Sequence, residues 1–489
     1  MMSLAIDTHR LVHLDLKSAP IQLSYLEKLI PLLAQLGATG LLIEWEDTFP
    51  YSGALVDIGS RNTVTNTYTS DEISRILHLA RSSSLIVIPL VQTIGHLEFV
   101  LKHPRWRHLR EVARYPSCLC PSKTPAAVDL VTAMIDQMIQ MHPNLTTLHI
   151  GADEVWNMGQ CDLCSKQSKH RLFLDHIKSV VTHVRNKHPS IISLVMWDDM
   201  LRSINIELLQ EYNFLDFVEP MVWHYQPAEF FQLNSDLWKK YSVVFKKVWV
   251  ASAFKGATGS CQILPVISHH ISNHEKWSMV LADPEFKMKF LGIALTGWSR
   301  FDHFAILCEL LPVAIPSLAL CLRTWIESFS LETHRSVSLA LGYSSELIPL
   351  DPFPSELVSE LAAARKQANP PASVLAPTPT PVKDQGKPRE SRPPNLKGYH
   401  HLRKNNCLRI KTSSPPSRMM MIWITTMTTL MISLSAPTMM YLQTQEVLIQ
   451  LLTLLSIELR KRRLTIKLKL SKIPLKNLLP LLSILNLIL

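Results

Sequence analysis

Residues 146–156 read TTLHIGADEVW, an apolar run that ends in two adjacent acids and a tryptophan. Seven other runs of this chain have the same form, apolar and rich in β-branched residues with polar or aromatic residues at the end. Strands of a parallel sheet are nearly continuous apolar runs because helices cover both of their faces. The eight predicted strands are Leu11–Leu16, Gly40–Trp45, Leu85–Val91, Thr146–Gly151, Ile191–Trp197, Phe217–Trp223, Val248–Ala253 and Leu291–Trp298.

The stretches between these runs carry apolar residues at three- and four-residue spacing, the period of an amphipathic helix. They include Ile21–Leu36, Ser70–Ala80, Ala127–His142 and His170–Lys187. Eight strand-then-helix units over about 300 residues match an α/β fold, the (β/α)8 TIM barrel, in number and length. A doubly wound open sheet uses the same units, but a count of eight favours the barrel, which we place at residues 8–345.

The alternation stops after Gly342. Residues 346–418 are rich in Pro, Ser and Lys, a composition typical of a solvated linker. Residues 419–489 form a low-complexity tail whose segment Met419–Gln445 carries no charge. That segment is long enough to cross a membrane, and a weak membrane segment is one interpretation of it, although its repeated threonines and Pro437 weaken that interpretation. An aspartate-rich tract read one base out of frame gives interspersed Met and Thr codons, so our hypothesis is a frameshifted or mispredicted tail. Sequencing the transcript across codons 400–420 tests it, and an intact frame there would refute it.

The net charge of +10 comes from the C-terminal region. Residues 367–489 hold 18 Lys and Arg against 4 Asp and Glu, and the rest of the chain holds 32 basic and 36 acidic residues. The main domain therefore lacks the excess of positive charge that nucleic-acid binding requires, and we expect no nucleic-acid partner. The N-terminal residues lack the pattern of a secretory signal, which favours a cytoplasmic or nuclear location. A membrane is not expected as a partner, and a homodimer is kept open as the assembly.

The chemistry of a TIM barrel gathers at the carboxyl ends of its strands, where this sequence places carboxylates beside tryptophans. Any one tryptophan is best explained by core packing, but several at corresponding strand ends favour a ligand pocket with apolar walls and a few polar groups. Such a pocket suits the apolar faces and hydroxyl rim of a sugar. The candidate site residues are Asp15, Glu44, His96, Asp153, Glu154, Trp197, Trp223, Tyr225, Trp298, Arg300 and Asp302.

Asp153 and Glu154 are the sharpest local signal. Two adjacent acids are costly to ionise together, so the pKa of one is expected to rise, as a general acid requires. Successive residues of a strand point to opposite faces. The pair must therefore lie beyond the regular strand if both side chains are to reach one sugar.

The segment Leu148–Trp156 resembles the catalytic signature of family 20 glycoside hydrolases. The resemblance extends over residues 8–345 and implies an exo-acting β-N-acetylhexosaminidase that hydrolyses terminal non-reducing GalNAc or GlcNAc residues with retention. In that family the 2-acetamido carbonyl attacks its own anomeric carbon, an exception to the rule of two carboxylates, and gives an oxazolinium intermediate. No cofactor and no metal are implied. The other stretches that carry the resemblance are Leu11–Lys17, Gly40–Tyr51, Val87–Lys102, Trp197–Leu201, Ala251–Gly259 and Leu295–His303.

The resemblance also implies roles for the chemical groups of the site. Asp153 would orient the acetamido N–H, and Glu154 would act as general acid and then as general base. Tyr225 would donate to the acetamido carbonyl, and His96 matches a pocket histidine of the family. The sugar and the acetamido methyl would be enclosed by Trp197, Trp223 and Trp298.

The hydroxyl contacts follow the family less closely. Arg300 and Asp302 would bind the 4- and 6-hydroxyls. On the first strand the family usually has an arginine that grips the 3- and 4-hydroxyls, and this sequence has Asp15 and Lys17 instead. This departure leaves the preference between the gluco and galacto sugars open.

Two alternatives accompany this interpretation. One is a glycosidase with a conventional carboxylate nucleophile, such as Glu219 or Asp198. The other is a non-catalytic glycan-binding barrel, either free or tethered to a membrane.

A separate motif, Cys161–Cys164, has the spacing of a zinc knuckle, but a structural zinc site needs four ligands and one clean pair is weak evidence. Its conceivable partners are Cys118, Cys120 and His170.

Overall fold

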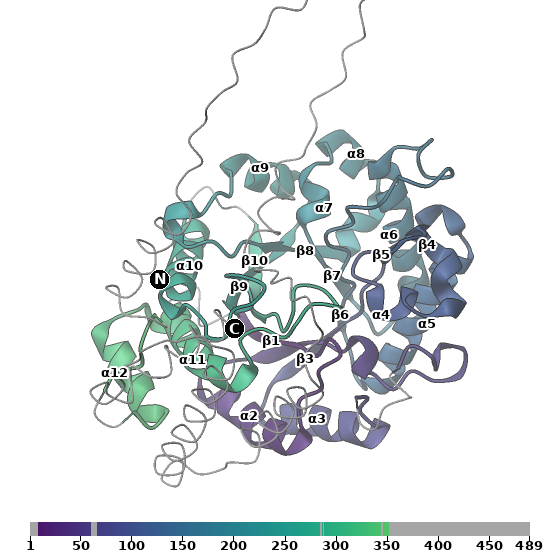
Figure 1. Ribbon diagram of the computed structural model, residues 1–489. Helices are drawn as coiled ribbons and strands as arrows, with labels where there is room; N and C mark the ends of the chain where they lie inside the picture. The colour runs from purple at the N-terminus through teal and green to yellow at the C-terminus, as the bar shows by residue number, and fades with distance from the viewer. Residues whose placement is uncertain (1–7, 60–65, 284–285, 287, 344–345, 352–489) are drawn as a thin grey trace, which may run out of the picture. The chain divides into compact units, whose positions relative to one another are not determined.

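The computed structural model describes residues 8–59, 66–283, 286, 288–343 and 346–351. Its centre is a closed barrel of eight parallel strands in the order β1-β10-β9-β8-β7-β6-β3-β2 (Figure 1). The prediction of a closed barrel rather than an open sheet is confirmed. The barrel strands are β1 His9–Asp15, β2 Gly40–Glu44, β3 Ile86–Leu90, β6 Thr147–His149, β7 Ser193–Trp197, β8 Val218–Trp223, β9 Lys247–Lys255 and β10 Lys289–Gly297.

Each barrel strand overlaps one of the eight predicted runs. The strands are buried along most of their length, since the barrel interior covers one face and the helices cover the other. Side chains fill the interior, so the barrel is a packed core and not a pore. The buried residues of this interior cluster are Leu11, Leu42, Ile88, Leu90, Val195, Trp197, Met221, Trp249, Ala251 and Ala294.

The helices surround the strands in Figure 1. The four helices predicted by residue range are present within two residues at each end as α2, α3, α5 and α6. At the start of α3 the sequence explains the boundary, because the Thr69 hydroxyl accepts from Glu72 N at 3.1 Å and the Glu72 carboxylate accepts from Thr69 N at 2.8 Å, a capping box. The α-helices are α2 Leu23–Gln35, α3 Ser70–Ser82, α4 Glu98–Leu101, α5 Ala126–Met141, α6 Lys169–Lys187, α7 Asp199–Arg202, α8 Ile206–Gln210, α9 Ser235–Val244, α10 Ile267–Leu281, α11 Leu311–Glu327 and α12 Leu331–Ala340.

The segment between β3 and α5, which lies outside the barrel, was not predicted from the sequence. Between β3 and α5 the chain forms α4 and an antiparallel hairpin of β4 (Arg110–Val112) and β5 (Tyr115–Leu119). The hairpin follows the loop that carries His96, and Leu119 N donates to Ile94 O at 2.9 Å while Leu97 N donates to Ser117 O at 3.1 Å. The hairpin is thereby fixed to the site side of the barrel.

The chain divides into two units, residues 1–392 and 393–489, and every described residue lies in the first unit. Most of the predicted linker and the whole predicted tail, with its frameshift hypothesis, lie outside the described residues. Among the described helices, none has the length and apolar character needed to cross a membrane.

Candidate active site

Asp153 and Glu154 lie beyond the regular strand, as both need to if they share a substrate. β6 ends at His149, and the chain then turns through positive φ angles of 62° at Gly151, 72° at Ala152 and 49° at Glu154. A side chain larger than glycine adopts this region at a cost, and such strain is concentrated at functional sites. The turn breaks the alternation of the strand, so the two carboxylates face one group instead of opposite sides.

That group is His96. Its Nε2 lies 3.3 Å from Asp153 Oδ2 and 3.5 Å from Glu154 Oε2. Burial disfavours a charged imidazole, but the carboxylate of Asp153, together with hydrogen bonds to both acids, holds the pKa of His96 well above its usual value. The structure therefore brings the predicted histidine within reach of both acids of the predicted pair, in surroundings that favour its charged form.

A buried amide holds Asp153 from behind. Gln92 Nε2 donates to Asp153 Oδ1 and to Glu44 Oε1, each at 3.2 Å, and Gln92 Oε1 accepts from Ala152 N at 3.2 Å. Glu44 is fully buried and stays ionised, since Lys17 and His13 lower its pKa against the effect of burial. Glu44, a predicted site residue, thus contacts Asp153 through Gln92, which was not among the candidate site residues.

Asp199 holds the backbone of the pair. Its Oδ2 accepts from Glu154 N at 2.9 Å, and its Oδ1 accepts from Trp223 Nε1 at 3.3 Å. Burial, followed by the nearby charge of Asp153, raises the pKa of Asp199 to about 7. The sequence led us to expect a raised pKa on one acid of the pair, and the raised pKa that the structure shows belongs to a third acid, Asp199, at the end of the next strand.

Asp199→Asn is expected to flatten the pH dependence of stability between about pH 4 and pH 7. The folded protein keeps the Asp199 proton up to about pH 7, well above the ordinary value of 3.8. The folded state then binds more protons than the unfolded state in this window, so wild-type stability falls as pH rises. Melting temperatures from pH 4 to pH 8 check this, with Asp302→Asn at an exposed aspartate as the control. Parallel curves for wild type and Asp199→Asn would contradict the assignment.

The aromatic candidates fall into two groups. Trp223 and Tyr225 stack with ring centroids 5.3 Å apart, and Trp298 meets the edge of His13 at 4.7 Å. These three aromatic side chains are partly exposed at the carboxyl ends of β8 and β10. Trp197 is 1% exposed and belongs to the barrel interior, with its ring 5.8 Å from that of Trp298. It supports Trp298 from below.

The three candidates for binding sugar hydroxyls differ in their burial and in the hydrogen bonds that they already make. Asp15 is buried, and its carboxylate accepts from Lys17 N at 3.1 Å and Ser299 N at 2.8 Å, which ties the end of β1 to the loop after β10. Arg300 donates to His303 O at 3.3 Å, while its buried Nε has no hydrogen-bond partner among the described residues. Asp302 is exposed and accepts from Phe304 N at 2.8 Å. Of the three, Arg300 is the candidate with a buried donor atom that has no hydrogen-bond partner among the described residues.

Neither rival nucleophile is available. Glu219 is the second residue of β8 and lies at the amino end of the barrel, where it accepts from Trp249 Nε1 at 2.8 Å and Lys247 Nζ at 3.1 Å. Glu219 is the third residue of the predicted strand Phe217–Trp223, so the sequence already placed it at the end opposite the site. Asp198 is at the correct end, but it is fully buried and bound by Arg202 through two hydrogen bonds of 2.7 Å.

Two groups of side chains away from the pair could coordinate a cation but are bonded internally. Glu46, Asp47 and His303 form a buried cluster beside Lys102, whose Nζ lies 3.1 Å from Asp47 Oδ2. Asp136, on the outer helix α5, is bonded by the imidazoles of two histidines at 2.8 and 2.6 Å and by Lys187 at 2.8 Å. The histidines are His183 and His188.

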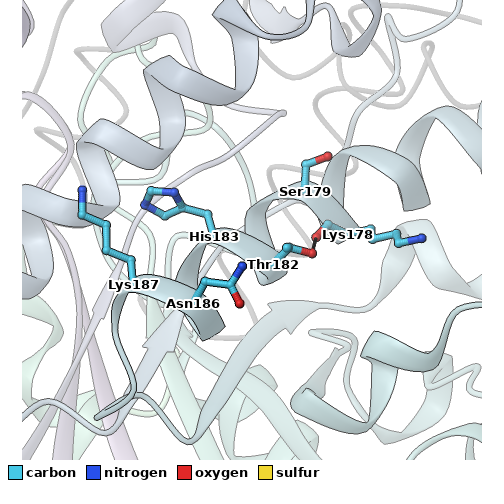
Figure 2. Close-up of a pocket in the computed structure, with 6 residues that line it drawn as sticks. All are labelled: Lys178, Ser179, Thr182, His183, Asn186 and Lys187. Carbon is cyan, nitrogen blue, oxygen red and sulfur yellow. Dashed lines mark hydrogen bonds between the residues drawn. The ribbon is translucent and has the colours of Figure 1, made fainter.

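An open hollow on the outside of the barrel lies beside that second group. Figure 2 shows that all of its lining side chains belong to the single helix α6. It presents no pair of carboxylates and no tryptophan, so it does not compete with the strand ends as the site of glycoside chemistry. The lining residues are Lys178, Ser179, Thr182, His183, Asn186 and Lys187.

Gly95→Ala is expected to reduce activity by roughly 100-fold, because a displacement of about 1 Å in a catalytic group costs that much. A methyl group on Gly95 would overlap the carbonyl oxygen of Asp153, so the turn carrying the pair must shift. Gly59→Ala is the control, since its added carbon would meet Phe49 O at an ordinary 3.4 Å. Steady-state kinetics with melting temperatures check the prediction. Full activity in a folded Gly95→Ala would show that the close approach does not position Asp153.

Known proteins resemble this chain in sequence and in fold. Residues 13–247 match the family model of the catalytic domain of glycosyl hydrolase family 20. Hexosaminidase D of Bos taurus is 46% identical over 345 residues, which are 69% of this chain and 97% of that protein. Hexosaminidase D of Homo sapiens is 44% identical over 345 residues, 69% of each chain. A solved chitobiase of Flavobacterium johnsoniae shares the fold at 15% identity, with a TM-score of 0.51 over 69% of this chain and 51% of that one. The chain therefore belongs to glycosyl hydrolase family 20 and is a glycoside hydrolase.

Proposed function

We propose that this glycoside hydrolase is a retaining exo-β-N-acetylhexosaminidase that uses the acetamido group of its substrate as the nucleophile. The observation that supports the proposal most is the strained turn after β6, which directs the adjacent carboxylates of Asp153 and Glu154 to one imidazole nitrogen at 3.3 and 3.5 Å. Both acids can reach one small ligand in that position. The names of the curated relatives point to the same sugar class.

The proposed first step needs one acid and one carboxylate. The acetamido oxygen forms a bond to the anomeric carbon while the bond to the aglycone oxygen breaks, and Glu154 gives its proton to the departing oxygen. Asp153 accepts the acetamido N–H and stabilises the positive charge of the oxazolinium. Gln92, bonded to Asp153 at 3.2 Å, keeps that carboxylate in place.

In the second step water attacks the anomeric carbon, the bond from that carbon to the acetamido oxygen breaks, and Glu154 takes the proton of the water. This restores the acid and the acetamido group and gives the β-configured sugar. The nucleophile and the anomeric carbon belong to one molecule, so well-aligned binding can contribute about 7–11 kcal/mol. Trp223 and Trp298, which are partly exposed at the ends of β8 and β10, would hold a face of the sugar.

Two alternatives are weaker on the same observations. A conventional nucleophile at Asp198 would have to break two 2.7 Å hydrogen bonds to Arg202. A glycan-binding barrel without catalysis has no need of a strained turn that brings two acids and a charged histidine together, since strain of this kind costs about 1–3 kcal/mol per residue.

The test uses the full chain with chromogenic β-GlcNAc and β-GalNAc glycosides. A thiazoline that mimics the bicyclic intermediate is expected to inhibit competitively and far more tightly than N-acetylglucosamine itself, because intermediate mimics exploit transition-state binding. NMR of the first product is expected to show the β anomer. An α anomer, or a thiazoline no tighter than the sugar, would overturn the proposal.

A further inference from the structure

Three thiols and a carboxylate converge beside the candidate active site. Glu111 of β4, Cys120 after β5, and Cys161 and Cys164 in the loop after β6 each place one ligand atom within 4.8 Å of the others. Cys120 Sγ lies 3.6 Å from Cys161 Sγ and 3.5 Å from Cys164 Sγ. The fold thus brings Cys120 to two cysteines that lie 41 and 44 positions later in the sequence.

The sulfur separations fit a shared cation better than a disulfide. A disulfide needs sulfurs about 2.05 Å apart, and three thiols cannot all be paired within their own group. Four ligands around a tetrahedral zinc with Zn–S bonds of about 2.3 Å place their sulfurs roughly 3.8 Å apart. The two sulfur separations of 3.5 and 3.6 Å are close to that spacing.

The carboxylate of Glu111 is the second, independent sign of a ligand. Glu111 is 3% exposed, and its Oε1 accepts from Gln160 N at 2.7 Å and Cys161 N at 2.9 Å. Its Oε2 is buried and has no hydrogen-bond partner in the described part of the chain. A buried carboxylate oxygen without a donor is costly, and a cation bound by the neighbouring sulfurs would satisfy it.

One backbone amide already points at a sulfur of the group. Cys164 N donates to Cys161 Sγ at 3.4 Å across the Cys-x-x-Cys turn, while the Cys164 thiol itself donates to the Ser122 hydroxyl oxygen at 3.0 Å. A backbone donor to Cys161 favours the thiolate, the form that binds metal.

We propose that Glu111, Cys120, Cys161 and Cys164 bind one structural zinc ion. Three thiolates select a soft or borderline cation, and one carboxylate completes the four ligands of a closed tetrahedral site. Sequence spacing alone pointed to the Cys161–Cys164 pair and to Cys118, Cys120 and His170 as partners. The structure selects Cys120 and adds Glu111.

The other two partners suggested by the sequence lie outside the group of four. Cys118 Sγ is directed at Leu119 O at 3.3 Å, and His170 Nε2 lies 3.3 Å from the Ser203 hydroxyl. Cys118 is also buried and lies two residues from a proposed ligand. It therefore offers a matched control.

The zinc would join two loops that support the catalytic pair. Cys161 and Cys164 follow Asp153 and Glu154 in the same loop, and Asn157 Nδ2 in that loop donates to Ser117 Oγ of β5 at 3.1 Å. The hairpin is bonded in turn to the loop of His96 through Leu97 N and Ser117 O at 3.1 Å. A metal between the hairpin and the catalytic loop would hold Asp153 and Glu154 at a fixed position relative to His96.

The experiment measures metal in the purified full chain by mass spectrometry, so it does not depend on activity or on the proposed substrate. About one zinc per chain is expected in the wild type and in Cys118→Ser, and a loss of most of it in Cys120→Ser and Cys161→Ser. Cobalt introduced in place of zinc is expected to show a sulfur-to-metal charge-transfer band in the wild type and Cys118→Ser only.

A chelator experiment on the wild type covers the case in which the cysteine variants do not fold. Removal of zinc is expected to expose three further thiols to a thiol reagent and to lower the melting temperature, and added zinc is expected to reverse both. The proposal is overturned by a folded chain that neither contains nor binds zinc, by a disulfide within the group, or by equal zinc loss in Cys118→Ser.

Discussion

Glu154→Gln is expected to lower kcat/KM for an N-acetylhexosaminide with a poor leaving group by about 10²–10⁴-fold, the usual contribution of a general acid. Glutamine keeps the size of the side chain and a hydrogen bond toward His96, which lies 3.5 Å from Glu154 Oε2. It cannot give a proton to the departing oxygen. Binding of the product sugar is expected to change little, because the lost interaction acts mainly in the transition state.

The leaving group separates loss of the acid from general damage. A nitrophenyl aglycone leaves without much help from a proton, so Glu154→Gln is expected to lose much less activity on it than on an alkyl glycoside. Glu219→Gln is the matched control, since Glu219 lies at the amino end of the barrel and bonds Trp249 and Lys247. Equal losses of Glu154→Gln on both aglycones would show that Glu154 is not the acid.

Much of the fold could be read from the sequence because one physical pattern repeats eight times. A buried parallel strand is apolar on both faces, so a run such as Ile191–Trp197 is recognisable without its partners and contains β7, Ser193–Trp197. The hairpin of β4 and β5 was not predicted, since its strands of three and five residues are short and lack a continuous apolar run. Its position depends on contacts with loops elsewhere in the chain, which no local pattern carries.

In the candidate site too, residues with a local sequence pattern could be predicted, and residues whose role depends on contacts elsewhere in the chain could not. Asp153 and Glu154 could be found because two adjacent acids follow an apolar strand between Gly151 and Trp156, and His96 because of the family resemblance. Asp199 was not among the candidate site residues, because its role depends on the hydrogen bond that it accepts from Glu154 N at 2.9 Å. Trp197 could not be told from Trp223 by sequence, because both end a strand and only packing buries the first to 1% exposure.

The sequence predicted a break in the strand geometry before Asp153 and Glu154, but it did not predict which residues adopt the strained backbone conformation. The requirement that both acids reach one sugar implied a break in strand geometry after β6. The sequence contains one glycine there, Gly151, whereas the structure also places Ala152 and Glu154 at positive φ. Neither residue type signals that conformation, and surrounding contacts such as Gln92 Oε1 with Ala152 N at 3.2 Å hold it in place.

The largest effect is expected from the substrate itself. Replacing the 2-acetamido group by a hydroxyl removes the proposed nucleophile, and turnover by the wild type is expected to fall below detection. Asp153→Asn is expected to lower kcat on the N-acetyl substrate by about 10²–10³-fold, the range for loss of one electrostatic contact to a developing charge. Asparagine preserves the shape but brings an amide dipole in place of the carboxylate that balances the oxazolinium.

The two changes together test the mechanism, because coupled changes are not additive. If Asp153 acts only through the acetamido group, Asp153→Asn has nothing further to remove on a 2-hydroxyl substrate, and turnover of that substrate is expected to stay below detection in both proteins. A conventional nucleophile predicts the opposite, since the hydroxyl substrate would be turned over by the wild type. Asp153→Asn would then reduce that rate only if Asp153 were itself the nucleophile. Rates on both substrates with both proteins, measured at one pH, decide between these outcomes.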